Sequence, residues 1–155
     1  MQANLEDVHL LDCASRTEEG LDLGEEELRL ALQVDSALMR QEGQQVWIAV
    51  MVGIAGKRKD VESPVFESHC RFALRYRLRD EYRASEEEIE AFREGNAIFH
   101  CWPYSRELLQ NLTTRMGLDV PPIPLLRLAP KAAQKAPAVS KRRAPLKQRR
   151  TPSEP

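Results

Sequence analysis

The sequence has few of the residues from which catalytic and metal sites are built. Its three cysteines show no motif spacing, and it contains no glycine-rich phosphate loop and no evident pair of carboxylates for acid–base chemistry. Two His-Cys dipeptides, at 69–70 and 100–101, invite a zinc interpretation, but zinc needs four convergent ligands. His69 and Cys70 are neighbours on an expected strand and would point to opposite faces. We therefore expect no enzyme activity, no cofactor and no metal site, with the cysteines mainly structural.

Long apolar runs and targeting signals are also missing. No apolar run approaches the length of about 18 residues that a membrane-spanning helix needs, so we expect no membrane insertion. The first residues, MQANLEDVHLLD, are acidic and lack the basic and then apolar start of a signal peptide. Together with an odd number of cysteines, this favours a reduced, cytoplasmic setting.

The formal net charge of -1 hides a division of the chain into two parts. Residues 131–155 hold eight Lys and Arg side chains and one acidic residue, Glu154, which gives them a net charge of +7 and leaves -8 on residues 1–130. The basic part has several prolines and no aromatic residue, so it cannot form a core. We expect a domain over 1–130 and a disordered basic tail over 131–155. The tail either is simply solvated or binds nucleic acid, an acidic partner or its own acidic body.

Period-two alternation predicts four strands in the first half of the chain. The clearest are 28–35, 46–55 and 66–78, with a shorter strand near Val8 and Leu10 and a turn at 41–44. Because the connections are short, we expect an antiparallel meander. Segment 46–55 is apolar on both faces, so it is either a central strand or a surface for a partner subunit.

The second half predicts two helices. Ser85 and Glu88 form a capping box before an apolar stripe of Ile89, Phe92, Asn96 and Phe99. We expect Pro103 to end this helix and to open a second one, capped by Gly117 and followed by an extended segment, 120–124. The second helix should present one face at a spacing of four residues: Tyr104, Leu108, Leu112 and Met116, widened by Ser105 and Leu109. The fold class is therefore α+β, a four-stranded antiparallel sheet packed against C-terminal helices.

This order of elements and one motif resemble a known family. The motif 99–107, FHCWPYSRE, is similar to the aromatic-Pro-Tyr-x-Arg-Glu helix start of the SecB export chaperones, and Asn96 stands where that family has an asparagine. The match is closer to the SecB-like chaperones of toxin–antitoxin systems, in which W-P-Y-x-R-E and T-x-R-M-G recur. The resemblance covers about residues 5 to 128.

The resemblance implies a sheet backed by a long helix, assembled into a dimer and then a tetramer, that holds unfolded chains without ATP. A client without a fixed shape needs a long apolar and aromatic groove with loose register. We expect unfolded or export-bound polypeptides, or an unstable antitoxin, as partners. Trp102 and Tyr104 either anchor the core or a subunit interface or contact the client, and the leucines have the same two alternatives. Arg106 and Glu107 are interpreted as a structural ion pair or an interface contact. The candidate client-binding residues are Trp47, Phe99, Trp102, Tyr104, Leu108, Leu109 and Leu112.

The sequence departs from the export family on the outer face of the sheet. That family contacts the translocase motor through acidic residues, whereas the last strand here offers His69, Arg71, Arg75 and Arg77. We therefore expect weak or no motor binding and a client-specific role. The alternative function is that of a nucleic-acid-associated protein acting through the basic tail.

Overall fold

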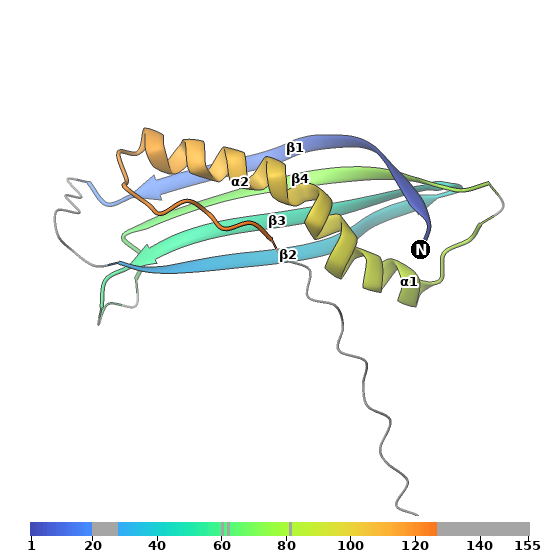
Figure 1. The fold of residues 1–155 in the computed structure, drawn as a ribbon, viewed down its shortest axis with the longest axis horizontal. Helices are drawn as coiled ribbons and strands as arrows, with labels where there is room; N and C mark the ends of the chain where they lie inside the picture. Colours follow the sequence, from blue (N-terminus) through green and yellow to red (C-terminus); the bar gives the residue numbers. More distant parts are fainter. Residues whose placement is uncertain (20–27, 60, 62, 81, 127–155) are drawn as a thin grey trace, which may run out of the picture.

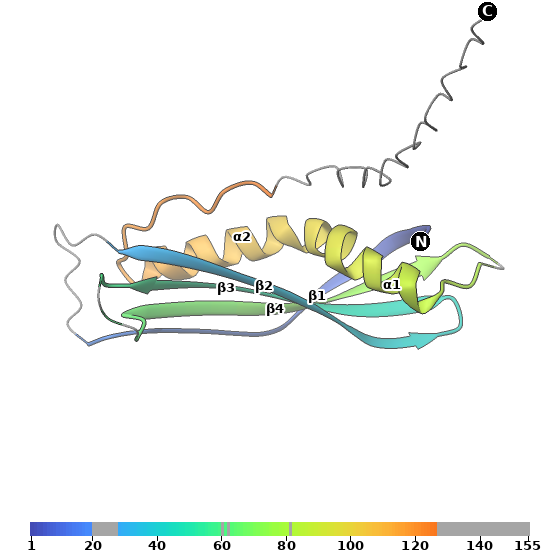
Figure 2. The ribbon, with the colours of Figure 1, turned by 90° about the horizontal axis from the view of Figure 1, so that it is seen from below.

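A four-stranded antiparallel sheet carries one helical layer on one of its faces (Figures 1 and 2). The computed structural model describes residues 1–19, 28–59, 61, 63–80 and 82–126, so the expected disordered tail over 131–155 lies outside the described residues. The strands are β1 (Ala3–Thr17), β2 (Arg29–Glu42), β3 (Gln45–Lys57) and β4 (Phe66–Leu78). The helical layer consists of α1 (Glu86–Phe92), the π-helical turn η1 (Arg93–Ala97) and α2 (Ile98–Arg115). We call the sheet face under the helices the inner face and the opposite one the outer face.

The strand order is β1-β4-β3-β2, which corrects the expected meander. Strands β2, β3 and β4 do follow one another as hairpins, but β1 lies beside β4 and not beside β2. In this order acidic side chains of β1 face arginines of β4, so the charges across the pair are complementary. The result is two central strands, β3 and β4, and two long edge strands, β1 and β2.

Strand β1 has 15 residues and is therefore much longer than the short strand that we predicted near Val8 and Leu10. Its register against β4 shifts twice, between Leu5 and Asp7 and between Leu10 and Asp12. Each shift inserts an extra residue and inverts the alternation, so no single period-two pattern runs through the segment. The bulges thus explain why the sequence pattern looked short.

The core lies between the helices and the two central strands. The segment predicted to be either a central strand or a partner surface forms β3, which is a central strand. Its even-numbered residues from Val46 to Ile54 are buried. The expected inward face of β4 is also confirmed, because Phe66, Ser68, Cys70, Phe72, Leu74, Tyr76 and Leu78 are all buried.

Strand β2 has the alternation predicted for 28–35, but much of its apolar inward face is open. Leu30 and Leu32 are 41% and 45% exposed, respectively, although both belong to the inner face, where they pair with Gly56 and Ile54. Because β2 is an edge strand and α2 packs mainly on β4, the helix leaves this side of the inner face uncovered. The alternation in the sequence identified the inward face of β2 correctly, but it could not show that the helix leaves this face uncovered.

The start and end of the helical layer follow the sequence signals. Ser85 caps α1, and the Ser85–Glu88 capping box is present in both directions. At the other end Gly117 has a φ of 74°, and the N–H groups of Gly117 and Leu118 donate to the carbonyls of Thr114 (3.0 Å) and Thr113 (3.1 Å). This is a Schellman motif, which requires a left-handed residue and so favours glycine.

The expected break at Pro103 is absent, since α2 runs through it to Arg115. Proline removes an N–H from the helix and leaves the carbonyl of Phe99 without its helical partner. Pro103 lies on the exposed side of α2, where solvent can hydrogen-bond that carbonyl and the helix can bend without ending. Figure 1 shows α1, η1 and α2 as one curved, continuous helical segment.

The π-helical turn η1 changes which side of α2 faces the sheet. A π turn adds one residue to the helix, so every later side chain is rotated by about one position relative to a continuous α-helix. The expected stripe holds at Ile89 and Phe92, but Asn96 and Phe99 are exposed and Ala97 is buried instead. On α2 the buried positions are Cys101, Trp102, Ser105, Leu109 and Thr113. Of the face predicted on this helix, Ser105 and Leu109 are buried, Leu108, Leu112 and Met116 are partly buried, and only Tyr104 is exposed.

Candidate functional site

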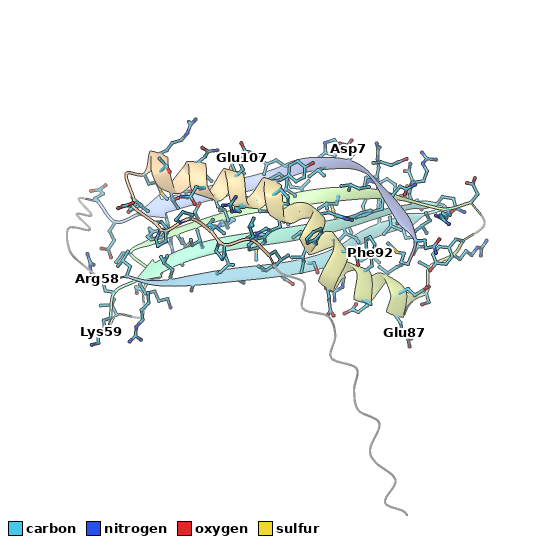
Figure 3. The ribbon with its side chains drawn as sticks, viewed as in Figure 1. Asp7, Arg58, Lys59, Glu87, Phe92 and Glu107 are labelled. Carbon is cyan, nitrogen blue, oxygen red and sulfur yellow. The ribbon has the colours of Figure 1, made fainter. Side chains whose placement is uncertain are left out.

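An aromatic cluster fixes the helical layer on the sheet. Tyr76 of β4 meets Phe92 edge to face with ring centroids 5.0 Å apart, and its hydroxyl lies 3.1 Å from Nδ1 of His100. Phe92, labelled in Figure 3, lies between the two layers. Burial lowers the pKa of His100 and raises that of Tyr76, so both side chains are neutral in the folded protein at neutral pH.

An extended segment folds back along α2 after the Schellman turn. We call residues 118–126 the strap; Figure 1 shows it in orange, running beside α2. Trp102 Nε1 donates to the Pro124 carbonyl (3.0 Å), Arg106 Nε donates to the Ile123 carbonyl (2.6 Å), and the Ile123 N–H donates to Gln110 Oε1 (3.2 Å). Arg106 thus binds the strap backbone, and no ion pair joins it to Glu107 within the described residues.

The strap shows what chemistry this side of α2 offers to an extended chain. Trp102, Arg106 and Gln110 are spaced four residues apart, so they form one stripe along the helix. All three side chains contact backbone atoms of the strap, and backbone atoms are the same in every polypeptide. Ile123 and Val120 are buried at the same time. The strap is therefore held on α2 both by hydrogen bonds to its backbone and by the burial of two of its apolar side chains.

The candidate residues predicted from sequence fall into three environments. Phe99 and Tyr104 are 45% and 46% exposed, respectively, and Leu108 and Leu112 are partly exposed on the same helix. Trp102 and Leu109 are buried within this chain, Leu109 completely. Trp47 lies on the outer face, where the Arg40 guanidinium stacks over its ring at 3.9 Å. The structure therefore does not bring Trp47 together with the other six, and client contact by any of them stays a prediction.

A first apolar surface lies between α2 and β1, and we call it the β1 flank: Leu5, Leu10, Phe72 and Tyr104. Phe72 links the two elements, because it is the direct partner of Leu10 in the sheet and its ring centroid lies 6.2 Å from that of Tyr104. Leu5 and Leu10 are 36% and 48% exposed, respectively. The short strand predicted near Val8 and Leu10 includes Leu10 but not Leu5, because the bulges of β1 interrupt the alternation that would join them on one face.

A second apolar surface lies on the other side of the helical layer, and we call it the β2 flank: Leu30, Leu32, Ile54 and Pro121–Pro124. Between these residues lies a hollow of about 230 Å³. Both leucines belong to the strand that the alternation predicted over 28–35, but that alternation does not show whether a strand is central or at an edge. An edge position of this strand would have identified the two leucines as exposed, but the edge position becomes known only with the strand order.

The outer face is charged and largely neutralised by cross-strand pairs. Arg71 Nη2 lies 2.7 Å from Asp12 Oδ2, Arg75 Nη2 lies 3.5 Å from Asp7 Oδ2, and Arg77 pairs with Glu6. The arginines therefore do not form the free basic surface that we expected, because β1 brings its acidic residues beside them. The weak motor binding that we predicted from that surface stays a prediction.

Chemical groups for catalysis or metal binding do not converge in the described ranges. No cluster of three or more His, Cys, Asp or Glu side chains that could hold a metal occurs there. Burial raises the pKa of the Cys101 thiol to about 11, which suppresses the nucleophilic thiolate. None of the helices in the described part of the chain is long and apolar enough to cross a bilayer.

Comparison with known proteins identifies the fold. No family model matches the sequence, and no curated protein matches it either. Among solved structures, the chain is similar to the Mycobacterium tuberculosis SecB-like chaperone Rv1957, solved in complex with a ChAD peptide from the antitoxin HigA1. The TM-score is 0.68 and the identity 22%, over 83% of this chain and 91% of that one. The chain has the SecB-like fold.

A second solved structure is more distant. It is a protein of unknown function from Streptococcus agalactiae, with 13% identity, a TM-score of 0.41, and coverage of 83% of this chain and 98% of that one. A score this low supports no argument. The SecB-like fold that the sequence motif predicted, a four-stranded antiparallel sheet with a helix on one face, is thus confirmed by Rv1957.

Proposed function

We propose that this protein is an ATP-independent holding chaperone of the cytoplasm, whose clients are unfolded polypeptides such as an unstable antitoxin. The observation that carries this proposal is the pair of exposed apolar flanks on either side of α2. The inward positions of β1 from Leu5 to Thr17 and of β2 from Leu30 to Leu38 include no charged side chain. An uncharged apolar surface of this extent is typical of a site that binds another chain.

The edge strands add a second means of binding an unfolded chain. Among the residues that the structure describes, strands β1 and β2 each pair on one side only, so their other sides present backbone N–H and C=O groups without a strand partner there. An extended client can hydrogen-bond to such an edge while its apolar side chains enter the adjacent flank. The strap demonstrates the same principle on α2, where side chains of the helix hold an extended backbone.

Holding requires no catalytic group and no nucleotide. A protein that binds the unfolded state lowers the free concentration of that state by mass action, and so suppresses its aggregation. The likeness to Rv1957, a chaperone solved with an antitoxin peptide, supports an antitoxin as one class of client.

The direct test is suppression of aggregation. The purified full chain should keep a chemically denatured client soluble at stoichiometric ratio, to the same extent with and without ATP. Leu32→Asp should weaken holding several-fold, because it places a charge in the β2 flank. Unchanged aggregation in the presence of excess native protein, verified as folded by circular dichroism, would refute the proposal.

We further propose self-association into a dimer and then a tetramer. The partly exposed, largely apolar outer residues of β3, such as Trp47 and Met51, and the α2 side chains from Tyr104 onward are the expected contact regions. Light scattering at micromolar concentration should give a mass above that of the 17.7 kDa chain. A monomer under these conditions would contradict the assembly.

The basic tail supports one alternative function. Its net charge of +7 would attract nucleic acid through phosphate contacts without sequence reading. Deleting residues 131–155 should abolish such binding, whose affinity should fall steeply with salt, and should leave client holding intact. If the truncated, folded protein loses holding, the tail belongs to the client site.

A further inference from the structure

All three cysteines of the chain, far apart in the sequence, converge in the fold. Cys13 on β1 is the direct partner of Cys70 on β4. On the helical side, the hydroxyl of Ser105 contacts the thiols of both Cys70 and Cys101, the latter at 3.2 Å. All three thiols are free in the structure. Cys70 is thus flanked by one cysteine across the strand pair and by another from the helix.

The geometry of the Cys13–Cys70 pair fits a disulfide. Residues directly opposite in an antiparallel pair project to the same face, with Cα atoms about 4.5 or 5.5 Å apart. Both separations lie within the range of about 4.4–6.8 Å that disulfides occupy. The next pair on the same face, Ser15 and Ser68, has the same ladder type, and its two Oγ atoms lie 2.6 Å apart. Side chains at these positions therefore meet across the strands.

Access to oxidants differs among the three thiols. Cys13 is exposed on edge strand β1, whereas Cys70 and Cys101 are completely buried. We propose that Cys13 and Cys70 form a reversible disulfide when the protein meets a hydroperoxide. Cys13 reacts first, because its thiol alone of the three is open to solvent.

Oxidation would proceed in two steps. The Cys13 thiol loses its proton to solvent, and the thiolate attacks the terminal oxygen of the hydroperoxide and becomes a sulfenic acid as the O–O bond breaks. The hydroxide or alkoxide that leaves takes up a proton from solvent and becomes water or an alcohol. The Cys70 thiol then attacks the Cys13 sulfur, the S–S bond forms, the S–O bond breaks, and the sulfenic oxygen leaves as water with the Cys70 proton. A thiol reductant reverses the product to two thiols.

The disulfide would tie an edge strand to the sheet. In the described part of the chain, β1 pairs with β4 alone, and the bond would close a loop that contains β2 and β3. Such a bond restricts the unfolded chain and also traps the Cys13 sulfenic acid before irreversible oxidation. Burial raises the pKa of Cys70, so its thiol is protected from direct oxidation but lies next to the Cys13 sulfur.

The test uses the full chain and hydrogen peroxide, with no client. After treatment, the protein is unfolded in denaturant with an alkylating agent and analysed by intact mass and peptide mapping. We expect one Cys13–Cys70 disulfide, an alkylated Cys101, restoration by dithiothreitol and a higher urea midpoint for the oxidised form. Cys13→Ser should show two alkylated thiols and no midpoint shift, and Cys101→Ala should still form the disulfide.

Several results would overturn the proposal. One is Cys13 oxidised to sulfinic acid, or joined to Cys13 of a second chain, while Cys70 remains alkylated. Another is a Cys70–Cys101 disulfide. A Cys13–Cys70 disulfide that leaves the urea midpoint unchanged would refute the tying of β1. Because no client is involved, these outcomes are independent of the holding function.

Discussion

Strand β1 presents two opposite surfaces on one backbone. On its outer face, Asp7 and Asp12 pair with arginines of β4, so the charges are compensated within the chain. On its inner face, Leu5 and Leu10 are exposed beside α2 and have no such compensation. Exposed apolar area costs about 25 cal/mol per Å², and burial by another chain recovers that free energy. The charges on the outer face of β1 therefore find their partners within one chain, while the exposed leucines of its inner face are suited to contact with a second chain.

The same contrast divides α2 into an anchoring stripe and a binding stripe. Leu109 is completely buried against the core, so Leu109→Ala should lower the free energy of unfolding by about 2–5 kcal/mol in urea denaturation. Tyr104→Ala, one of the exposed positions, should cost much less stability and weaken client holding several-fold. If Leu109→Ala proves as stable as the native chain, the assignment of the two stripes is wrong.

Gly56 and Gly53 of β3 allow the tightness of packing on the inner and outer faces of the sheet to be compared. A Cβ at Gly56 would collide with the buried ring of Phe66, whereas one at Gly53 would come no closer than 3.5 Å to His69. Gly56→Ala should therefore destabilise the fold by about 1–3 kcal/mol. Gly53→Ala is the matched control and should be nearly neutral in thermal denaturation. Equal effects would contradict the packing of the inner face.

His100, a partly buried residue of α2, gives the stability of the fold a pH dependence. Burial lowers its pKa below the ordinary value, so the unfolded chain binds its proton more readily than the folded one. The contribution to stability is complete above about pH 6.5, the usual histidine value, and is lost as pH falls below it. His100→Asn should flatten the slope of urea-unfolding free energy between pH 7 and 5. An unchanged slope in this variant would show that other groups produce it.

The smallest effect is expected on the outer face. Arg71→Ala removes an ion pair with Asp12 between half-exposed side chains, so it should lower the free energy of unfolding by less than about 1 kcal/mol. The difference from the native chain should vanish at high salt, which screens the pair. Client holding should not change. A loss of holding in this folded variant would mean that the outer face also binds clients.

Several parts of the fold could be predicted because their signals are local. The Ser85–Glu88 capping box, Gly117 and the alternation of β3 and β4 each depend on residues close in sequence, and each is confirmed. The motif from Phe99 to Glu107 led to the SecB-like fold, although it was interpreted as a helix start and proves to lie inside α2.

The errors have physical causes that no local pattern carries. One extra residue in η1 rotates α2 relative to α1, so the stripe that holds at Ile89 and Phe92 does not continue to Asn96 and Phe99. Two bulges disguised the length of β1. The pairing of β1 with β4 joins residues distant in sequence, and it determines both which strands are edges and whether the arginines have acidic partners. The flanks follow from these long-range facts, so sequence analysis could not find them.

The central claim is that clients bind the inner flanks and not the outer face, and one pair of matched double variants tests it. Leu10→Asp with Leu32→Asp adds two carboxylates to the inner face of the edge strands. Ala14→Asp with Gln33→Asp adds the same charge to the same strands on the outer face, at exposed positions. The affinity for a labelled, permanently unfolded client is measured by fluorescence anisotropy. Only variants whose urea-unfolding midpoint is close to that of the native chain are compared. We predict that the inner pair loses affinity at least tenfold while the outer pair stays within about twofold, since one buried charge without a partner costs well over 1.4 kcal/mol. Equal losses, or a loss confined to the outer pair, would contradict the account.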